Sequence, residues 1–288
     1  MAAMRQTGFA PDPVPRGSSA TRSLGAFVLG LFLCSVFACK QAAPDANPAE
    51  RELTVFAATS LKDAFTAIGS DFRRTHPGVE LKLNFAGTQE LHTQLDHGAP
   101  ADVFAAADKR HMQELLQAQR VLSPFTFALN EPVLVVANEK REQVRQFADL
   151  PLAGRIILGV PEVPIGRYTL EILERASAML GHDFQTRVEA KVISRELNVR
   201  QVLAKVGLGE ADAGIVYRSD VGAAEKRVAV LPIPSEINVI AEYPIARVAD
   251  ARHPDLAREW LTSVLSDAGR EKLGAAGFAL PPPTPLAP

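Results

Sequence analysis

Small neutral hydrogen-bond donors recur at four places along this 288-residue chain. Each place joins an apolar run that predicts a strand to a run with helical spacing: Thr59-Ser60, Gly87-Thr88, Pro164-Ile165-Gly166 and Asn198-Val199. Hydroxyl groups and the free N–H groups at a helix start can together bind an anion without any positive side chain. Taken singly, each junction is more simply explained as a helix cap, because Ser, Thr and Asn are common caps. Ser60 is expected to be such a cap.

Three further residues could contact an anion. Tyr217 ends an apolar run and could donate its hydroxyl hydrogen, although a partly buried structural tyrosine is the simpler interpretation. Arg167 and Arg200 fall in the first turns of two predicted helices and could bind an anion with two parallel hydrogen bonds. Surface ion pairs are the more frequent role for such arginines.

The signals of catalysis are weak. The sequence contains no Walker A motif and no Gly-x-Ser-x-Gly motif. Gly207, Gly209 and Gly214 follow a predicted helix and form no dinucleotide fingerprint. Asp102 and Asp108 could be a carboxylate pair, but a strand start and a helix cap explain them more simply. Six histidines lack His-x-x-x-His spacing: His76, His92, His97, His111, His182 and His253. We therefore expect a protein that is not an enzyme and needs no cofactor.

Predicted strands alternate with predicted helices along the chain. The strands are Leu53–Ala58, Val79–Phe85, Asp102–Ala105, Val133–Ala137, Ile156–Gly159, Glu189–Ile193, Ala213–Tyr217 and Asn238–Val248. The helices are Leu61–Thr75, Gln89–His97, a helix from Asp108 to about Gln119, Ile165–Leu180, Val199–Val206 with Asn198 as its cap, Pro254–Leu265 and Asp267–Ala276. This alternation predicts an α/β fold with mostly parallel sheets, and the number of units favours two lobes.

The N-terminus has the composition of an export signal. Three arginines precede an uncharged run from Ser23 to Ala38, which is shorter than the roughly 20 residues that span a bilayer. We expect residues 1–38 to be a signal peptide. The run Val36-Phe37-Ala38-Cys39 resembles a bacterial lipobox and predicts lipidation of Cys39, with ordinary cleavage near Ala38 as the alternative.

Both cysteines, Cys34 and Cys39, lie in or next to this segment, so the predicted folded body has no disulfide. Residues 39–51 are rich in Ala and Pro and predict a flexible linker, and residues 281–288 predict a Pro-rich tail. The body that remains is acidic and has no basic run, which argues against nucleic acid as a partner.

Five motifs then occur in a specific order. They are Val55-Phe56-Ala57-Ala58-Thr59-Ser60-Leu61; Ala99-Pro100-Ala101-Asp102-Val103-Phe104 with Ala107-Asp108; Gly159-Val160-Pro161-Glu162-Val163-Pro164-Ile165-Gly166-Arg167-Tyr168; Gly214-Ile215-Val216-Tyr217-Arg218-Ser219-Asp220; and Glu242-Tyr243-Pro244. From about Leu53 to Leu280, the sequence resembles the molybdate-binding proteins of bacterial ABC importers, the ModA family.

The resemblance implies a type II periplasmic-binding fold, in which two α/β lobes close on an oxyanion. Lobe 1 would comprise residues 52–132 and 246–280, and lobe 2 residues 133–245. The crossovers would lie near Val133–Ala137 and Tyr243–Val248. Carried over by position, the ligand donors would be Ser60, Thr88, Ile165, Val199 and Tyr217, and molybdenum would be bound only as molybdate through them. The family commonly has Ser at the position of Thr88, and the loop before Ile165 is a residue shorter here.

The chemistry of molybdate fits these residues, since a fully deprotonated tetrahedral dianion only accepts hydrogen bonds. The implied function is that of an extracytoplasmic substrate-binding subunit for molybdate, with tungstate as a second ligand. Its partners would be a membrane permease and the ATPase of that permease, and the protein would be a monomer, periplasmic or at the cell surface. The alternative is a receptor for sulfate or another tetrahedral oxyanion, because cavity size would decide among these ligands.

Overall fold

The computed structural model describes residues 51–222 and 226–282, all within one structural unit. The predicted signal peptide, the predicted lipidation site Cys39, nearly all of the predicted linker and the end of the predicted tail lie outside the described residues. Among the described helices, none combines the length and apolarity needed to cross a membrane.

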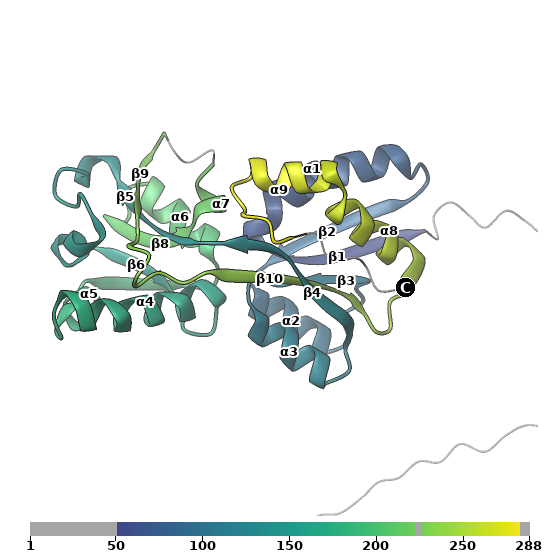
Figure 1. The fold of residues 1–288 in the computed structure, drawn as a ribbon, viewed down its shortest axis with the longest axis horizontal. Coiled ribbons are helices and arrows are strands. Elements are labelled where there is room, and N and C mark those ends of the chain that lie inside the picture. The colour runs from purple at the N-terminus through teal and green to yellow at the C-terminus, as the bar shows by residue number, and fades with distance from the viewer. Residues whose placement is uncertain (1–50, 223–225, 283–288) are drawn as a thin grey trace, which may run out of the picture. The chain divides into compact units, whose positions relative to one another are not determined.

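Two five-stranded mixed sheets form the framework (Figure 1). The first has the order β2 (Glu80–Ala86), β1 (Glu52–Ala58), β3 (Val103–Ala105), β10 (Ala241–Val248) and β4 (Val121–Asn130). The second has the order β7 (Val192–Glu196), β6 (Ile156–Gly159), β8 (Ala213–Tyr217), β5 (Pro132–Ala137) and β9 (Val228–Pro232). In each sheet four strands run in one direction and the fourth in order is reversed. This is the predicted α/β class with mostly parallel sheets.

Helices cover both faces of each sheet (Figure 1). On the first sheet, α1 (Lys62–Thr75), α8 (Pro254–Leu265) and α9 (Asp267–Ala275) pack together, while α2 (Thr88–Asp96) and α3 (Lys109–Gln117) form a separate pair. On the second sheet, α4 (Pro164–Leu180) packs against α5 (Phe184–Glu189), and α6 (Val199–Gly207) packs against α7 (Arg218–Val221). Short 3-10 helices occur at η2 (Thr59–Leu61), η3 (Asn138–Lys140) and η4 (Phe147–Leu152).

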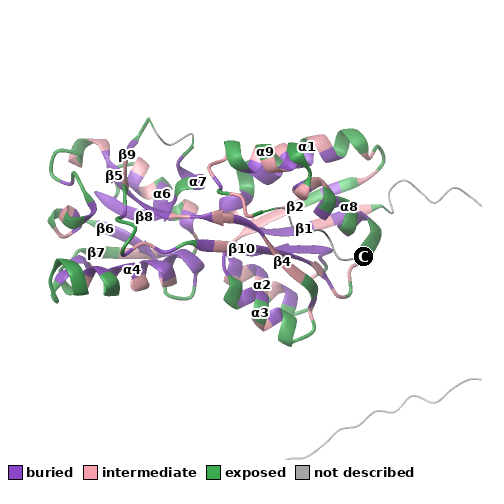
Figure 2. Ribbon diagram, in the orientation of Figure 1, coloured by how far each residue is buried: buried purple, intermediate pink, exposed green. Residues whose placement is uncertain are grey.

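The central strands β3, β5, β6 and β8 are buried on both faces, the edge strands are partly exposed, and the outer faces of the helices are exposed (Figure 2). Successive side chains of β1 point to opposite faces of the sheet and so pack into two hydrophobic clusters. Val55 and Ala57 pack into the main cluster, and Phe56 packs into a second cluster with Leu91 of α2. Covering helices on both sides explain why these strands are nearly continuous apolar runs.

The chain passes between the sheets twice, first at Glu131 between β4 and β5 and then between β9 and β10. Strand β10 belongs to the first sheet along its whole length, because Ala241 already pairs with Asn130 of β4. The return passage therefore lies before Ala241, ahead of the expected boundary at residues 245 and 246. The expected crossovers Val133–Ala137 and Tyr243–Val248 are the strands that follow each passage.

The prediction from sequence missed two strands and misassigned a third. Strand β4 was not predicted, since Ser123 and Pro124 interrupt its pattern, and its pairing is with distant residues: β10 and, at Leu129, an isolated bridge to Ala279. Strand β9 was not predicted either. The strand predicted at Glu189–Ile193 is instead the end of α5 followed by β7, because Phe184 and Val188 have helical spacing and are both buried.

Candidate functional site

One small cavity lies where helices following strands of both sheets begin. The first lobe contributes Ala58, Thr59, Ser60, Ala86, Gly87, Thr88 and Ala107, and the second contributes Val163, Pro164, Ile165, Asn198, Val199 and Tyr217. The cavity measures about 20 Å³, enough for one or two water-sized groups. Ligands as large as typical drugs need pockets of roughly 300 Å³ or more, so this arrangement suits a ligand of very few atoms.

All five residues predicted as oxyanion donors line this cavity: Ser60, Thr88, Ile165, Val199 and Tyr217. They lie as many as 157 positions apart in the sequence, on five different elements. The structure thus brings the five together, with Ser60 and Thr88 on the first lobe and the other three on the second.

Three longer helices start at the cavity. Helix α2 begins at Thr88, α4 at Pro164 and α6 at Val199. The N–H groups of a first helical turn have no partner within the helix, and the helix dipole adds positive potential there. Asn198 caps α6 as predicted, with its side chain accepting from the Gln201 N–H at 3.1 Å. The three helix starts therefore give the cavity a positive character without a charged side chain.

Ser60 is not the helix cap that its sequence position predicted. It lies within η2, is buried, and has its Oγ 2.9 Å from the hydroxyl of Tyr243. The Nδ2 of Asn130 donates to the same Tyr243 hydroxyl at 3.4 Å and to the Ser219 Oγ at 2.7 Å. Because Asn130 donates to the Tyr243 oxygen, Tyr243 can donate its own hydroxyl hydrogen to the Ser60 oxygen. The hydroxyl hydrogen of Ser60 is then available to a ligand.

Sequence reasoning did not assign a role to Tyr243 or Asn130. Tyr243 was visible as part of the Glu242-Tyr243-Pro244 motif, but nothing in the sequence named Ser60 as its partner. The two residues lie on β10 and β4, the strands that adjoin the two passages between the sheets.

Thr88 has a similar arrangement. Its Oγ1 accepts the backbone N–H of Ala107 at 3.1 Å, and the side chain is buried. Since that contact uses an oxygen lone pair, the hydroxyl hydrogen of Thr88 can point into the cavity.

The hydroxyl of Tyr217 is buried and has no hydrogen-bond partner among the described residues. Its ring is held edge-on by Tyr168 and Tyr243, with ring centres 6.4 and 5.8 Å away. Burial raises the pKa of Tyr217 well above its usual value, so the hydroxyl keeps its hydrogen at neutral pH. A buried polar group without a partner costs about 1–3 kcal/mol, and a ligand that accepts this hydrogen would recover that cost.

The two candidate arginines do not line the cavity; they form ion pairs between the lobes. Arg200 donates to Asp63 of α1 at 2.9 Å and lies 2.8 Å from Asp220 of α7, the latter without the alignment of a hydrogen bond. Arg167 donates to Asp108, the cap of α3, at 3.1 Å. The pairs with Asp63 and Asp108 join the two lobes beside the cavity, whereas Asp220 belongs to the same lobe as Arg200.

Two carboxyl groups beside these arginines, Asp220 and Asp108, have opposite pKa shifts. Burial raises the pKa of Asp220 to about 7, although Arg200 opposes this effect. Burial would also raise the pKa of Asp108, but hydrogen bonds from His111 and Arg167 outweigh it and lower that pKa. Asp108 is therefore firmly ionised at neutral pH.

The loop before α4 requires the glycine at position 166. A Cβ at Gly166 would lie 1.9 Å from the carbonyl oxygen of Val160. This close approach holds the start of α4, and with it Ile165, against the loop that begins at Val160.

Comparison with known proteins gives a consistent result. The family described as bacterial extracellular solute-binding protein matches residues 53–279. The molybdate-binding protein ModA of Mycobacterium tuberculosis is 37% identical over 261 residues, which is 88% of this chain and 96% of that protein. ModA of Escherichia coli is 33% identical over 69% of this chain and 78% of that protein.

The fold is also similar to solved structures. The periplasmic molybdate-binding protein of Azotobacter vinelandii superposes with a TM-score of 0.70 at 19% identity, over 80% of this chain and 99% of that one. At this identity the likeness speaks for the two-lobed fold alone. From the sequence matches, the chain belongs to the family of bacterial extracellular solute-binding proteins that includes the molybdate-binding proteins ModA.

Proposed function

We propose that this protein is the extracytoplasmic substrate-binding subunit of an ABC importer, and that it binds molybdate and tungstate in the cavity between its lobes. The observation that carries the proposal is the buried Tyr217 hydroxyl without a partner at the cavity wall. The names of the relatives support the choice of ligand.

The donor set fits a dianion that only accepts hydrogen bonds. Ser60, Thr88 and Tyr217 offer hydroxyl hydrogens, and Ile165 and Val199 offer backbone N–H groups at helix starts. Among the described residues that line the cavity, none is a carboxylate that could accept the proton of a phosphate. Hydrogen bonds to a charged group contribute about 1.5–3 kcal/mol each, so five or six of them can exceed the roughly −8 kcal/mol of micromolar binding even after ordering costs.

The donors come from both lobes, so the bound oxyanion would favour the closed arrangement. The ion pairs of Arg200 with Asp63 and of Arg167 with Asp108 would strengthen that arrangement once it forms. A closed, loaded protein would then deliver its ligand to the permease, which the separate ATPase drives.

Calorimetric titration with molybdate, tungstate, sulfate and phosphate tests the proposal. We expect saturable heat with one equivalent of molybdate or tungstate, at micromolar affinity or better. A protein that gives no heat with molybdate but binds sulfate or phosphate would instead be the alternative oxyanion receptor, and the assignment would be overturned.

Export and anchoring are part of the same proposal. We infer that residues 1–38 are removed as a signal peptide and that Cys39 becomes a lipidated first residue, with residues 39–51 as the tether of a monomeric protein. Mass spectrometry of the mature N-terminus tests this. A mature protein that starts after Cys39, or a Cys39→Ala variant that stays attached to the membrane, would contradict it.

A further inference from the structure

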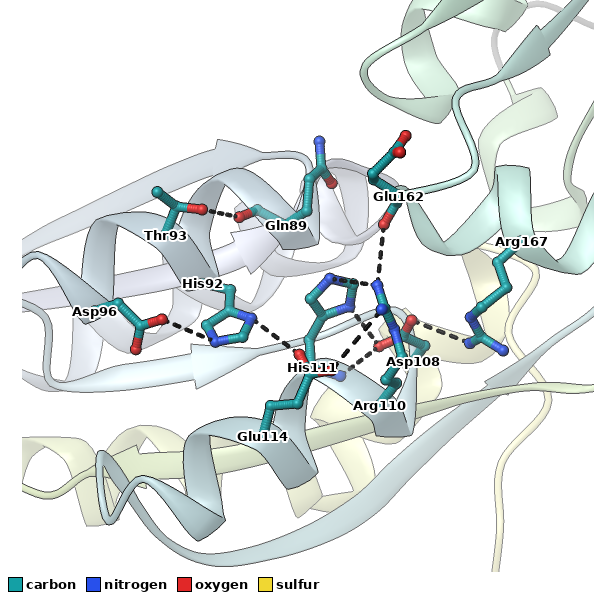
Figure 3. A network of polar contacts seen from close by, with 10 residues as sticks. All are labelled: Gln89, His92, Thr93, Asp96, Asp108, Arg110, His111, Glu114, Glu162 and Arg167. Atoms are coloured by element: carbon teal, nitrogen blue, oxygen red, sulfur yellow. Dashed lines mark hydrogen bonds and ion pairs between the residues drawn. The ribbon is translucent and has the colours of Figure 1, made fainter.

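A cluster of ligating side chains lies between α2 and α3, on the first lobe and outside the oxyanion cavity. His92 of α2 and His111 and Glu114 of α3 each present one ligating atom, and these three atoms lie within 4.8 Å of one another (Figure 3). Such a trio on two packed helices could hold a metal ion if the imidazole lone pairs point at the shared space.

The contacts of His111 fix its tautomer. Its Nδ1 lies 2.9 Å from the buried Oδ1 of Asp108, which as a carboxylate can only accept. Its Nε2 lies 3.2 Å from a guanidinium nitrogen of Arg110, which can only donate. Both neighbours therefore place the hydrogen on Nδ1 and the lone pair on Nε2. A carboxylate that orients a histidine through its other ring nitrogen is the usual support of a metal ligand.

The contacts of His92 leave an electrostatic conflict. Its Nε2 lies 3.2 Å from Asp96 and its Nδ1 lies 3.5 Å from Glu114. A neutral imidazole has one N–H, so when it donates to Asp96 its Nδ1 lone pair faces the Glu114 carboxylate. A cation between Nδ1 and the carboxylate would turn the repulsion into two attractive contacts.

The ligand types select the class of ion. Two imidazole nitrogens and one carboxylate oxygen suit zinc and similar divalent transition metals, whereas magnesium and calcium prefer oxygen alone. Zinc bonds of about 2.0–2.2 Å require the three atoms to approach one another further. Glu114 is half exposed and Arg110 is exposed by a similar fraction, so both can move.

We propose that His92, His111 and Glu114 form a binding site for a divalent transition metal such as Zn²⁺. The ion takes the place of the Arg110 guanidinium at His111 Nε2, and Asp108 and Asp96 support the two histidines from behind. The Arg110 nitrogen that contacts His111 also donates to the carbonyl oxygen of Glu162, 3.4 Å away across the cleft, so the displaced guanidinium has a partner toward which it can move. With three protein ligands, the fourth position stays open to water.

Competition against a chromophoric zinc chelator tests the site, using Zn²⁺ and the full chain without a histidine tag. We expect one equivalent of Zn²⁺ to bind, and His92→Gln and Glu114→Gln each to weaken the affinity at least tenfold. His97→Gln is the matched control, since His97 ends the same helix, is exposed and lies outside the cluster.

Circular dichroism must show that each variant is folded. If His92→Gln fails to fold, Glu114→Gln decides, because its side chain is exposed and its shape is kept. A chain that binds no Zn²⁺ overturns the proposal. Zinc binding that is equal in wild type and in folded Glu114→Gln also overturns it, since the ion would then lie elsewhere, for example at Cys34 and Cys39.

Discussion

Replacing Tyr217 with phenylalanine should have opposite effects on ligand binding and on stability. The hydroxyl makes no hydrogen bond within the described protein, so Tyr217→Phe breaks none. It removes a buried polar group whose lack of a partner costs about 1–3 kcal/mol. The ligand-free variant should therefore be as stable as wild type or more stable.

Molybdate binding should weaken in the same variant. The lost hydrogen bond to a charged ligand is worth about 1.5–3 kcal/mol, which corresponds to a decrease of about 10-fold to 150-fold in affinity. Calorimetric titration gives the affinity, and thermal melts without ligand give the stability.

Tyr243→Phe is the matched control for this experiment. Tyr243 is equally buried, but its hydroxyl contacts Ser60 and Asn130. Removing it should lower stability by about 1 kcal/mol or more, since two buried polar groups lose a partner. A folded Tyr217→Phe protein that binds molybdate within threefold of wild type would refute the role of Tyr217 as a donor.

Three further predictions concern neighbouring residues. Ser60→Ala should weaken molybdate binding at least tenfold, as titration would show, and an unchanged affinity in a folded variant would remove Ser60 from the site. Arg200→Gln should weaken molybdate binding severalfold because the Asp63 contact between the lobes is lost. Arg155→Gln, which breaks an ion pair within the second lobe, should leave molybdate binding unchanged. If both variants changed the affinity equally, a role of Arg200 in closure would be contradicted. The pKa of Asp108 is lowered from about 3.8, so its ionised form adds stability above that pH, and this stability is lost as the pH falls through the lower folded value. Denaturant melts from pH 6 to pH 3 should show the gap between wild type and Asp108→Asn narrowing below about pH 4, and a constant gap would refute this.

The sequence predicted the elements that local pattern determines. Strands such as Ala213–Tyr217 are uninterrupted apolar runs, and Asn198 and Asp108 are caps whose side chains accept N–H groups three residues later. Their signals are local, so a single sequence carries them. Strand β4 was missed because Pro124 interrupts its pattern and because its partners, β10 and Ala279, are far along the chain.

For the site, the positions of the residues could be predicted but their hydrogen-bond partners could not. The five positions were carried over from the resemblance to the ModA family, and the structure places them around one cavity. The contact of Ser60 with Tyr243 was not predictable, because it joins residues 183 positions apart. The same holds for the ion pair of Arg200 with Asp63, 137 positions apart. Hydrogen-bond partners at such separations depend on the tertiary fold, which no local pattern encodes.

The reversed strand in each sheet has a consequence for folding. Strand β10 lies between β3 and β4, so the first sheet cannot close until a segment from the far end of the sequence is inserted. Among the described residues, β4 would otherwise keep only the bridge of Leu129 with Ala279, and Asn130 would lack Tyr243. The lobe that is made first is thus completed last. Folding of the two lobes is consequently a shared, cooperative event dominated by contacts between distant residues, which are slow to form.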